Sequence, residues 1–171
     1  HGFGRLCLYG ASGTGKTAFA RWLADHIGQP LLIKRGSDLQ SPYIGEMEQN
    51  LAKAFAEAEE QKAVLLLDEV DSLLQDRRNA VRSWEIAQVN EFLVQMESFN
   101  GIVITTTNRF DDLDQAALRR FDFKIHFDYL TYAQRLQLFK QVCQQLNIEI
   151  NEQQISAKLK QLNRLCAGDF A

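Results

Sequence analysis

Short apolar segments recur along most of the chain, and each is followed by a stretch with helical spacing. The clearest lies at residues 63–67, where five consecutive apolar residues end at Asp68 and Glu69. A continuously apolar strand is typical of a parallel sheet that is covered on both faces. Similar segments lie at 5–9, 31–35, 102–106 and 123–127. The pattern therefore predicts an α/β fold, an open doubly wound sheet of five strands that binds its ligand at the carboxyl ends of the strands.

Apolar positions between these segments follow the period of an amphipathic helix. Met47, Leu51, Phe55 and Ala58 recur at helical steps and predict a helix over about 46–61. A short helix is expected at 114–118, and two longer ones carry the stripes Phe19, Leu23 and Ile27, and Ile86, Val89, Leu93 and Met96. The second of these longer helices is expected at about 80–98.

The pattern changes after Asp128, where helical spacing alone continues. Thr131 and Gln134 form a capping box, and Asn151 and Gln154 form another. The first precedes a helix whose inward positions are Tyr132, Leu136, Phe139, Cys143 and Leu146. We therefore predict two domains, an α/β subdomain at 1–130 and an incomplete helical subdomain at 131–171.

The composition is that of a globular protein, with 46% hydrophobic and 24% charged residues in 171 and a net charge of −3. This charge argues against a general electrostatic grip on nucleic acid or on an anionic membrane. Three separated cysteines form no C-x-x-C pair and indicate buried thiols in a reducing compartment, so a cytoplasmic protein is expected. Because the first strand begins almost at His1, we expect the chain to be part of a longer protein.

Residues 10–17 match the phosphate-binding pattern G-x-x-x-x-G-K-[ST], between a predicted strand and a predicted helix. Glycines let backbone N–H groups approach a polyphosphate, and the helix that follows adds the positive end of its dipole. Lys16 is expected to reach the terminal phosphates, and the Thr17 hydroxyl is expected to bind Mg²⁺. The predicted nucleotide-binding set is Gly10, Ala11, Ser12, Gly13, Thr14, Gly15, Lys16 and Thr17.

Two neighbouring carboxylates follow the most apolar strand and supply the second half of a candidate active site. Asp68 is predicted to hold Mg²⁺, and Glu69 to polarise the water that attacks the terminal phosphate. Asp71 is either a supporting residue or merely exposed. Asn108, after the strand at 102–106, either orients the same water or is an ordinary turn residue.

The chain resembles the AAA family of ATPases, part of the AAA+ class of P-loop NTPases. The resemblance rests on five stretches in order: residues 10–17, S-P-Y-I-G-E at 41–46, residues 65–71, T-T-T-N at 105–108, and A-A-L-R-R-F-D at 116–122. It implies a five-stranded parallel sheet in the order 5-1-4-3-2, flanked by helices, with a truncated C-terminal helical lid. It also implies an ATPase that uses ATP and Mg²⁺ and works as a ring, a hexamer, on a protein substrate.

The resemblance also assigns roles to individual residues. Asn108 corresponds to the first sensor, and Arg119 and Arg120 correspond to arginine fingers that reach the nucleotide of a neighbouring subunit. Tyr43 and Ile44 correspond to the tip of a pore loop that grips an extended polypeptide. The alternative for Tyr43 is a turn residue packed on the core.

Two other functions compete with a remodelling motor. One is an ATP-gated assembly or scaffold protein with slow hydrolysis, which the presence of Glu69 and both arginines argues against. The other is a DNA-processing AAA+ protein, for which the loose basic group Arg77, Arg78 and Arg82 is the main support. Such a group is more typical of a solvated surface, so a nucleic-acid partner is not expected.

Overall fold

A computed structural model gives the fold of the chain and describes all residues except 1–2, 44, 77, 79–82, 149–151 and 171. The chain divides into two compact units. One contains His1–Gly10 and Lys16–His126, and the other contains Ala11–Gly15 and Phe127–Ala171. In the part of the chain that the model describes, no helix has both the length and the apolar character needed to cross a membrane.

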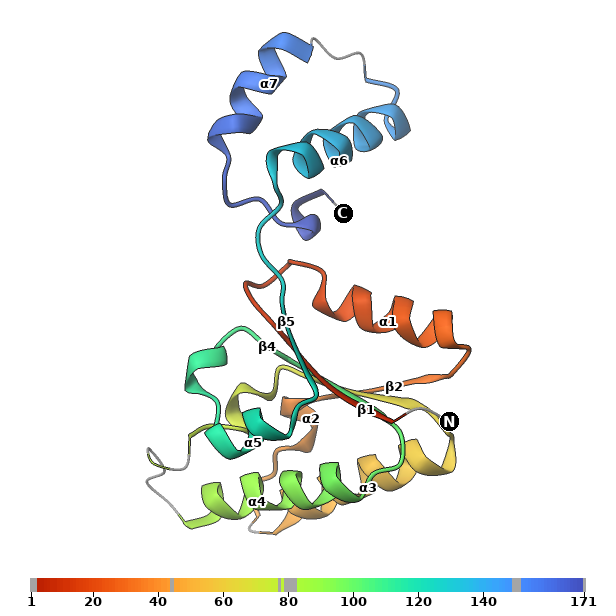
Figure 1. Cartoon of the computed structure of the whole chain (residues 1–171), viewed down its shortest axis with the longest axis vertical. Coiled ribbons are helices and arrows are strands. Elements are labelled where there is room, and N and C mark those ends of the chain that lie inside the picture. The colour runs from red at the N-terminus through yellow and green to blue at the C-terminus, as the bar shows by residue number, and fades with distance from the viewer. Residues whose placement is uncertain (1–2, 44, 77, 79–82, 149–151, 171) are drawn as a thin grey trace. The chain divides into compact units, whose positions relative to one another are not determined.

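The first unit is built on a parallel sheet of five strands (Figure 1). The strands are β1 (Gly4–Tyr9), β2 (Leu31–Arg35), β3 (Val64–Asp68), β4 (Ile102–Thr107) and β5 (Phe123–His126). Their spatial order is β2-β3-β4-β1-β5. Read from the other edge, this is the predicted order 5-1-4-3-2, and the prediction is confirmed. All five carboxyl ends lie at the same side of the sheet because every pairing is parallel.

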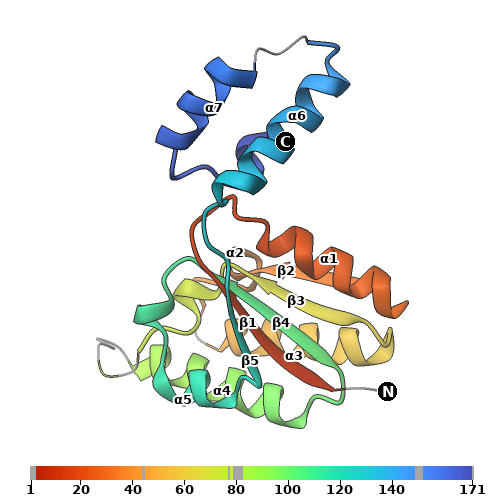
Figure 2. The same ribbon diagram turned by 45° about the horizontal axis from the view of Figure 1, so that its top comes forward.

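Helices cover both faces of this sheet (Figure 2). One face carries α1 (Lys16–Ile27), and the other carries α3 (Glu46–Glu60), α4 (Ser83–Ser98) and α5 (Gln115–Arg120). A single helical turn, α2 (Gly36–Leu39), leaves the end of β2. The predicted helix at 46–61 is confirmed as α3, and that at 114–118 as α5. Residues 80–82 of the helix predicted at 80–98 lie outside the described residues.

The main apolar core lies between the sheet and α3 and α4. The four predicted inward residues of α3 are all buried, each at most 4% exposed. Among them, the ring of Phe55 meets Phe99 edge-on at a centroid distance of 5.3 Å and lies 6.4 Å from Phe92. Fully burying a side chain of this size contributes roughly 1.5–3 kcal/mol. The sheet is therefore held rigidly from the side opposite α1.

The helix α1 packs on the sheet differently from the expected stripe. Its fully buried residues are Ala20 and Ala24, whereas Ile27 in the apolar stripe is 39% exposed. Small residues let a helix backbone come close to a sheet, and larger neighbours then lie at the margin of the contact. The helix α1, which begins at the phosphate loop, thus packs on the sheet through its own alanines.

The second unit is helical, with α6 (Tyr132–Gln145), α7 (Glu152–Gln161) and the 3₁₀ turn Ala167–Phe170. The capping box of Thr131 and Gln134 is present as predicted. Asn151 of the second predicted box lies outside the described residues. The inward position predicted for Leu146 is wrong, since this side chain is 63% exposed. The helix ends at Gln145, so the next residue no longer continues the helical stripe.

Candidate active site

The phosphate loop joins β1 directly to α1. Gly10, Gly13 and Gly15 have φ values of 136°, 76° and 98°, which residues with a Cβ rarely adopt. The loop ends where α1 begins, so the positive end of the helix dipole lies at the loop. The Lys16 Nζ donates a hydrogen bond of 2.8 Å to the carbonyl oxygen of Gly10. Its ammonium group is therefore held at the start of the loop.

The middle of the phosphate loop makes its own contact within the helical unit. The backbone N–H of Gly168 donates to the carbonyl oxygen of Gly13 over 2.9 Å. A Cβ on Gly168 would lie only 3.2 Å from that oxygen, a tight contact that favours glycine here. Segment 167–170 thus contacts the phosphate loop at Gly13.

Asp68 and Thr17, separated by 51 residues in the chain, lie next to each other. The Thr17 hydroxyl is 3.2 Å from Oδ1 and 3.3 Å from Oδ2 of Asp68, to which it donates. Both residues were predicted to bind Mg²⁺, and the structure brings their oxygen atoms together. A hydroxyl and a carboxylate are the hard oxygen ligands that Mg²⁺ prefers, so the residues present fit this ion.

Glu69 follows Asp68 in a left-handed backbone conformation, with φ 58° and ψ 57°. The strand therefore ends at Asp68, and a 3₁₀ turn of Val70–Ser72 follows Glu69. The alternation of faces along a strand therefore stops at Glu69, which lies in the turn and not in the strand. Different roles for the two acids remain a prediction.

Threonines of β4 bind this acidic turn. The Thr106 hydroxyl donates to Oδ1 of Asp68 and accepts from the backbone N–H of Glu69 at 2.9 Å. The neighbouring Thr107 hydroxyl donates to the carboxylate of Asp71, which is thereby a supporting residue. Sequence reasoning assigned no role to these threonines, because β-branched residues are ordinary strand formers. Three consecutive hydroxyl residues in a buried central strand are the signal that was available.

The remaining predicted residues lie at two different edges of the sheet: Asn108 follows β4 at the carboxyl edge, whereas Arg119 and Arg120 lie at the opposite edge, shortly before β5 begins. Asn108 is exposed directly after β4. Arg119 and Arg120 end α5, where Arg119 is exposed and has no side-chain hydrogen bond among the described residues. The Arg120 guanidinium instead pairs with Glu97 of α4, and its Nη1 donates to the Ala116 carbonyl at 3.0 Å. The two adjacent arginines therefore differ in their freedom to reach outward.

The predicted pore loop lies between α2 and α3. Tyr43 is 69% exposed, so it is not packed on the core as the alternative required. Gly45 has a φ of 86° and begins α3. Ile44 lies outside the described residues. A cavity of about 510 Å³ adjoins this loop.

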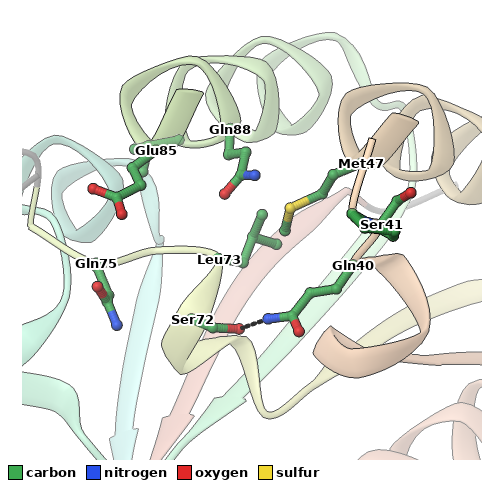
Figure 3. A pocket seen from close by; sticks show the side chains of 10 residues that line it. Gln40, Ser41, Met47, Ser72, Leu73, Gln75, Glu85 and Gln88 are labelled. Atoms are coloured by element: carbon green, nitrogen blue, oxygen red, sulfur yellow. Dashed lines mark hydrogen bonds between the residues drawn. The ribbon is translucent and has the colours of Figure 1, made fainter. Parts of the chain in front are cut away.

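The walls of this cavity come from three parts of the first unit (Figure 3). Gln40 and Met47 flank the loop, Ser72 and Leu73 belong to the turn after Glu69, and Gln88 comes from α4. The Gln40 Nε2 donates to the Ser72 Oγ at 2.7 Å. Gln40, which flanks the exposed loop, is thus hydrogen-bonded to the turn that follows Glu69.

Two other groups singled out by the sequence have no place in this site. The Cys7 thiol is fully buried, and burial raises its pKa from 9.0 to about 11, so it is not a nucleophile at neutral pH. Of the basic group, Arg78 pairs with Asp76, while Arg77 and Arg82 lie outside the described residues. The predicted nucleic-acid alternative gains no support from Arg78.

A family model described as "ATPase family associated with various cellular activities (AAA)" matches residues 6–129. The chain belongs to the AAA family of ATPases. This AAA chain is 32% identical to spastin of Ixodes scapularis over 170 residues, which cover 95% of the chain and 26% of that protein. It is 34% identical over 142 residues to the ATP-dependent zinc metalloprotease FtsH 2 of Thermoanaerobacter sp. (strain X514), covering 79% of the chain and 28% of that protein.

Among solved structures, the AAA domain of FIGL-1 in complex with ADP is similar to this AAA chain with a TM-score of 0.77 and 26% identity. The match covers 96% of the chain and 56% of that structure. Membership of the AAA family identifies the chain as an ATP-binding, ATP-hydrolysing domain. The chain spans only about a quarter of the length of the curated relatives described above.

Proposed function

We propose that the chain is the motor domain of a ring-forming, hexameric ATPase that depends on Mg²⁺ and remodels or threads a protein substrate. The observation that carries the proposal is the contact between the Thr17 hydroxyl and the Asp68 carboxylate, with Glu69 next in the chain. A phosphate loop and an acidic strand end meet there, which is the arrangement that phosphoryl transfer from ATP requires.

Each residue of the site has a role that its position supports. Thr17 and Asp68 would hold Mg²⁺, which when bound neutralises charge on the phosphate oxygens. Lys16 would move from the Gly10 carbonyl to the terminal phosphates of ATP, because a phosphate is a stronger acceptor for an ammonium group. Glu69 would accept a proton from the attacking water, and the exposed amide of Asn108 would orient that water.

A ring explains the position of the two arginines at the end of α5. The developing negative charge on the transferred phosphate is stabilised by an arginine, and in this proposal the arginine comes from the neighbouring subunit. In the single chain Arg119 is exposed, as expected for a residue that acts on a neighbouring subunit. A site shared in this head-to-tail manner favours closed cyclic assembly.

A polypeptide substrate is supported by the loop that carries Tyr43. An exposed aromatic ring, here Tyr43, can contact any polypeptide without reading its sequence. The adjoining cavity presents amide and hydroxyl groups, which both donate and accept hydrogen bonds as peptide groups do. One relative is named an ATP-dependent metalloprotease, which acts on polypeptides.

The test is the rate of ATP turnover per subunit, measured over a range of protein concentrations with and without Mg²⁺. Turnover that rises with concentration to a plateau, and that EDTA abolishes, is expected if subunits complete each other's sites. Glu69→Gln should bind ATP and lose turnover. A rate per subunit that is independent of concentration would refute the shared site, and an active Glu69→Gln variant would refute the role of Glu69.

A further inference from the structure

The backbone of Glu69 adopts a left-handed conformation that residues with a side chain do not favour. Left-handed φ and ψ values in a residue with a side chain carry a steric cost and persist only where surrounding contacts enforce them. The contacts that enforce this turn are therefore relevant to where the Glu69 carboxylate points. Two such contacts are present, one on each side of β3, from β4 and from the end of β2.

The contact from β4 is the Thr106 hydroxyl, which uses its single proton and a lone pair on the same turn. It donates to Oδ1 of Asp68 and accepts from the N–H of Glu69 at 2.9 Å. Thr106 is only 2% exposed, so water cannot readily replace it. One hydroxyl thus fixes the carboxylate of the first acid and the backbone of the second relative to each other.

The contact from β2 is the backbone of Gly36, the first residue after the strand. A Cβ at Gly36 would lie 2.4 Å from the carbonyl oxygen of Glu69 and 3.7 Å from that of Asp68. The strand register places Arg35 opposite Asp68, so Gly36 lies directly beside the Glu69 peptide. The φ of Gly36 is not in the left-handed region, so it is the space and not the backbone conformation that excludes a side chain. Any methyl group at this position must displace the Glu69 peptide or the backbone of α2.

We propose that Thr106 and Gly36 are positioning residues that hold the Asp68–Glu69 turn so that the Glu69 carboxylate faces the attacking water. The inference rests on the proposed function, because it takes Glu69 as the residue that activates that water. Neither residue belongs to the predicted nucleotide-binding set at 10–17, so their effect should fall on the chemical step more than on ATP binding.

The test compares Thr106→Val with Thr105→Val, a matched control one residue away in the same strand. The Thr105 hydroxyl donates a long bond of 3.4 Å to the Leu6 carbonyl and is hydrogen-bonded to the Cys7 thiol, and neither of these partners belongs to the acidic turn. Thr106→Val should lower kcat by about 10–100-fold, the range for a lost supporting hydrogen bond, with KM for ATP changed less than about threefold. Thr106→Ser restores the hydroxyl and should recover most of kcat.

Gly36→Ala tests the other contact independently of Thr106. Its control is Gly4→Ala, where the added Cβ would only meet the Leu6 side chain at an ordinary 3.6 Å. Gly36→Ala should lower kcat at least tenfold while ATP binding is retained, because the misplaced carboxylate no longer reaches the water. Gly4→Ala should leave both unchanged.

Rates are to be normalised to the number of sites that bind a fluorescent ATP analogue, so that unfolded protein does not count. Equal losses in Thr106→Val and Thr105→Val, or a Thr106→Ser variant as slow as Thr106→Val, would overturn the role of Thr106. A normal kcat in Gly36→Ala would overturn the role of Gly36. Glu69→Gln separates the proposed function from the positioning inference. If that variant stays active, the proposed role of Glu69 fails. If it is inactive, the Thr106 and Gly36 variants test the positioning inference alone.

Discussion

Arg119 and Arg120 are adjacent, yet their surroundings predict very different effects of substitution. Arg119 is exposed, whereas Arg120 is held by Glu97 and by the Ala116 carbonyl. We therefore expect Arg119 to be the principal finger and Arg120 to anchor the end of α5 on α4. Arg119→Ala should leave the stability of the isolated chain unchanged and lower turnover of the assembled protein.

The magnitudes follow from the contacts of each arginine. Loss of an arginine finger costs about three to five decades of rate, or about 4–7 kcal/mol of transition-state stabilisation. Loss of an anchor that places the finger costs about 10–100-fold. To act as a finger itself, Arg120 would first break a partly exposed ion pair worth at most about 1 kcal/mol and one hydrogen bond of about 1 kcal/mol. The cost of breaking both contacts would lower the ATP turnover that an Arg120 finger supports by about 30-fold.

Glu97→Gln distinguishes the two arginines because it releases Arg120 and leaves Arg119 untouched. If Arg120 were the finger, this variant should turn over ATP faster by up to about fivefold, because it removes the ion pair of about 1 kcal/mol and leaves the hydrogen bond to Ala116 in place. If Arg119 is the finger, turnover should stay level or fall slightly. An increase in Glu97→Gln, or a larger loss in Arg120→Ala than in Arg119→Ala, would refute the assignment.

A mixing assay tests whether the arginine acts on a neighbouring subunit. Arg119→Ala and Glu69→Gln are each expected to be inactive alone. In a random equal mixture, half of the subunits retain Glu69, and half of those face a neighbour that retains Arg119. Roughly a quarter of the sites should therefore recover ATP turnover if each site hydrolyses ATP independently of the others. A mixture that stays as inactive as its components at saturating concentration would contradict a finger that acts between subunits.

Three further predictions address the substrate loop, a buried thiol and a helix cap. Tyr43→Ala should keep ATP turnover and lose processing of an unfolded protein substrate, and a variant that still processes it would remove the pore-loop role. Because the pKa of Cys7 rises from 9.0 to about 11 on folding, the folded state keeps the thiol proton. The contribution of Cys7 to the free energy of unfolding is therefore constant below pH 9. It should fall as pH rises from 9 to 11, by up to about 1.4 kcal/mol per pH unit. Cys7→Ala should lack this loss in denaturant titrations at pH 8 and pH 10.5. Thr131→Ala removes the cap of α6 and should cost about 1 kcal/mol in the same measurement, whereas Thr131→Ser should cost little.

The sequence by itself determined the features that depend on neighbouring residues. The order of strands and helices follows from short-range apolar periodicity, and the capping box at Thr131 is complete within four residues. The phosphate loop is likewise local, since its glycines and Lys16 lie within one turn of chain. The resemblance to the AAA family added the strand order, which local periodicity does not specify.

Only the tertiary structure decided the contacts between segments that are distant in the chain. Thr106 binds the acidic turn because β4 lies beside β3, and Gly36 must be glycine because β2 lies on the other side. In the same way, the packing of α5 on α4 gives Arg120 a partner and leaves Arg119 exposed. Residue type and spacing do not encode which of many possible neighbours a hydroxyl, a glycine or a guanidinium group will meet. That is settled only when burial of the apolar core fixes the strand order and brings those backbones within a few ångströms of each other.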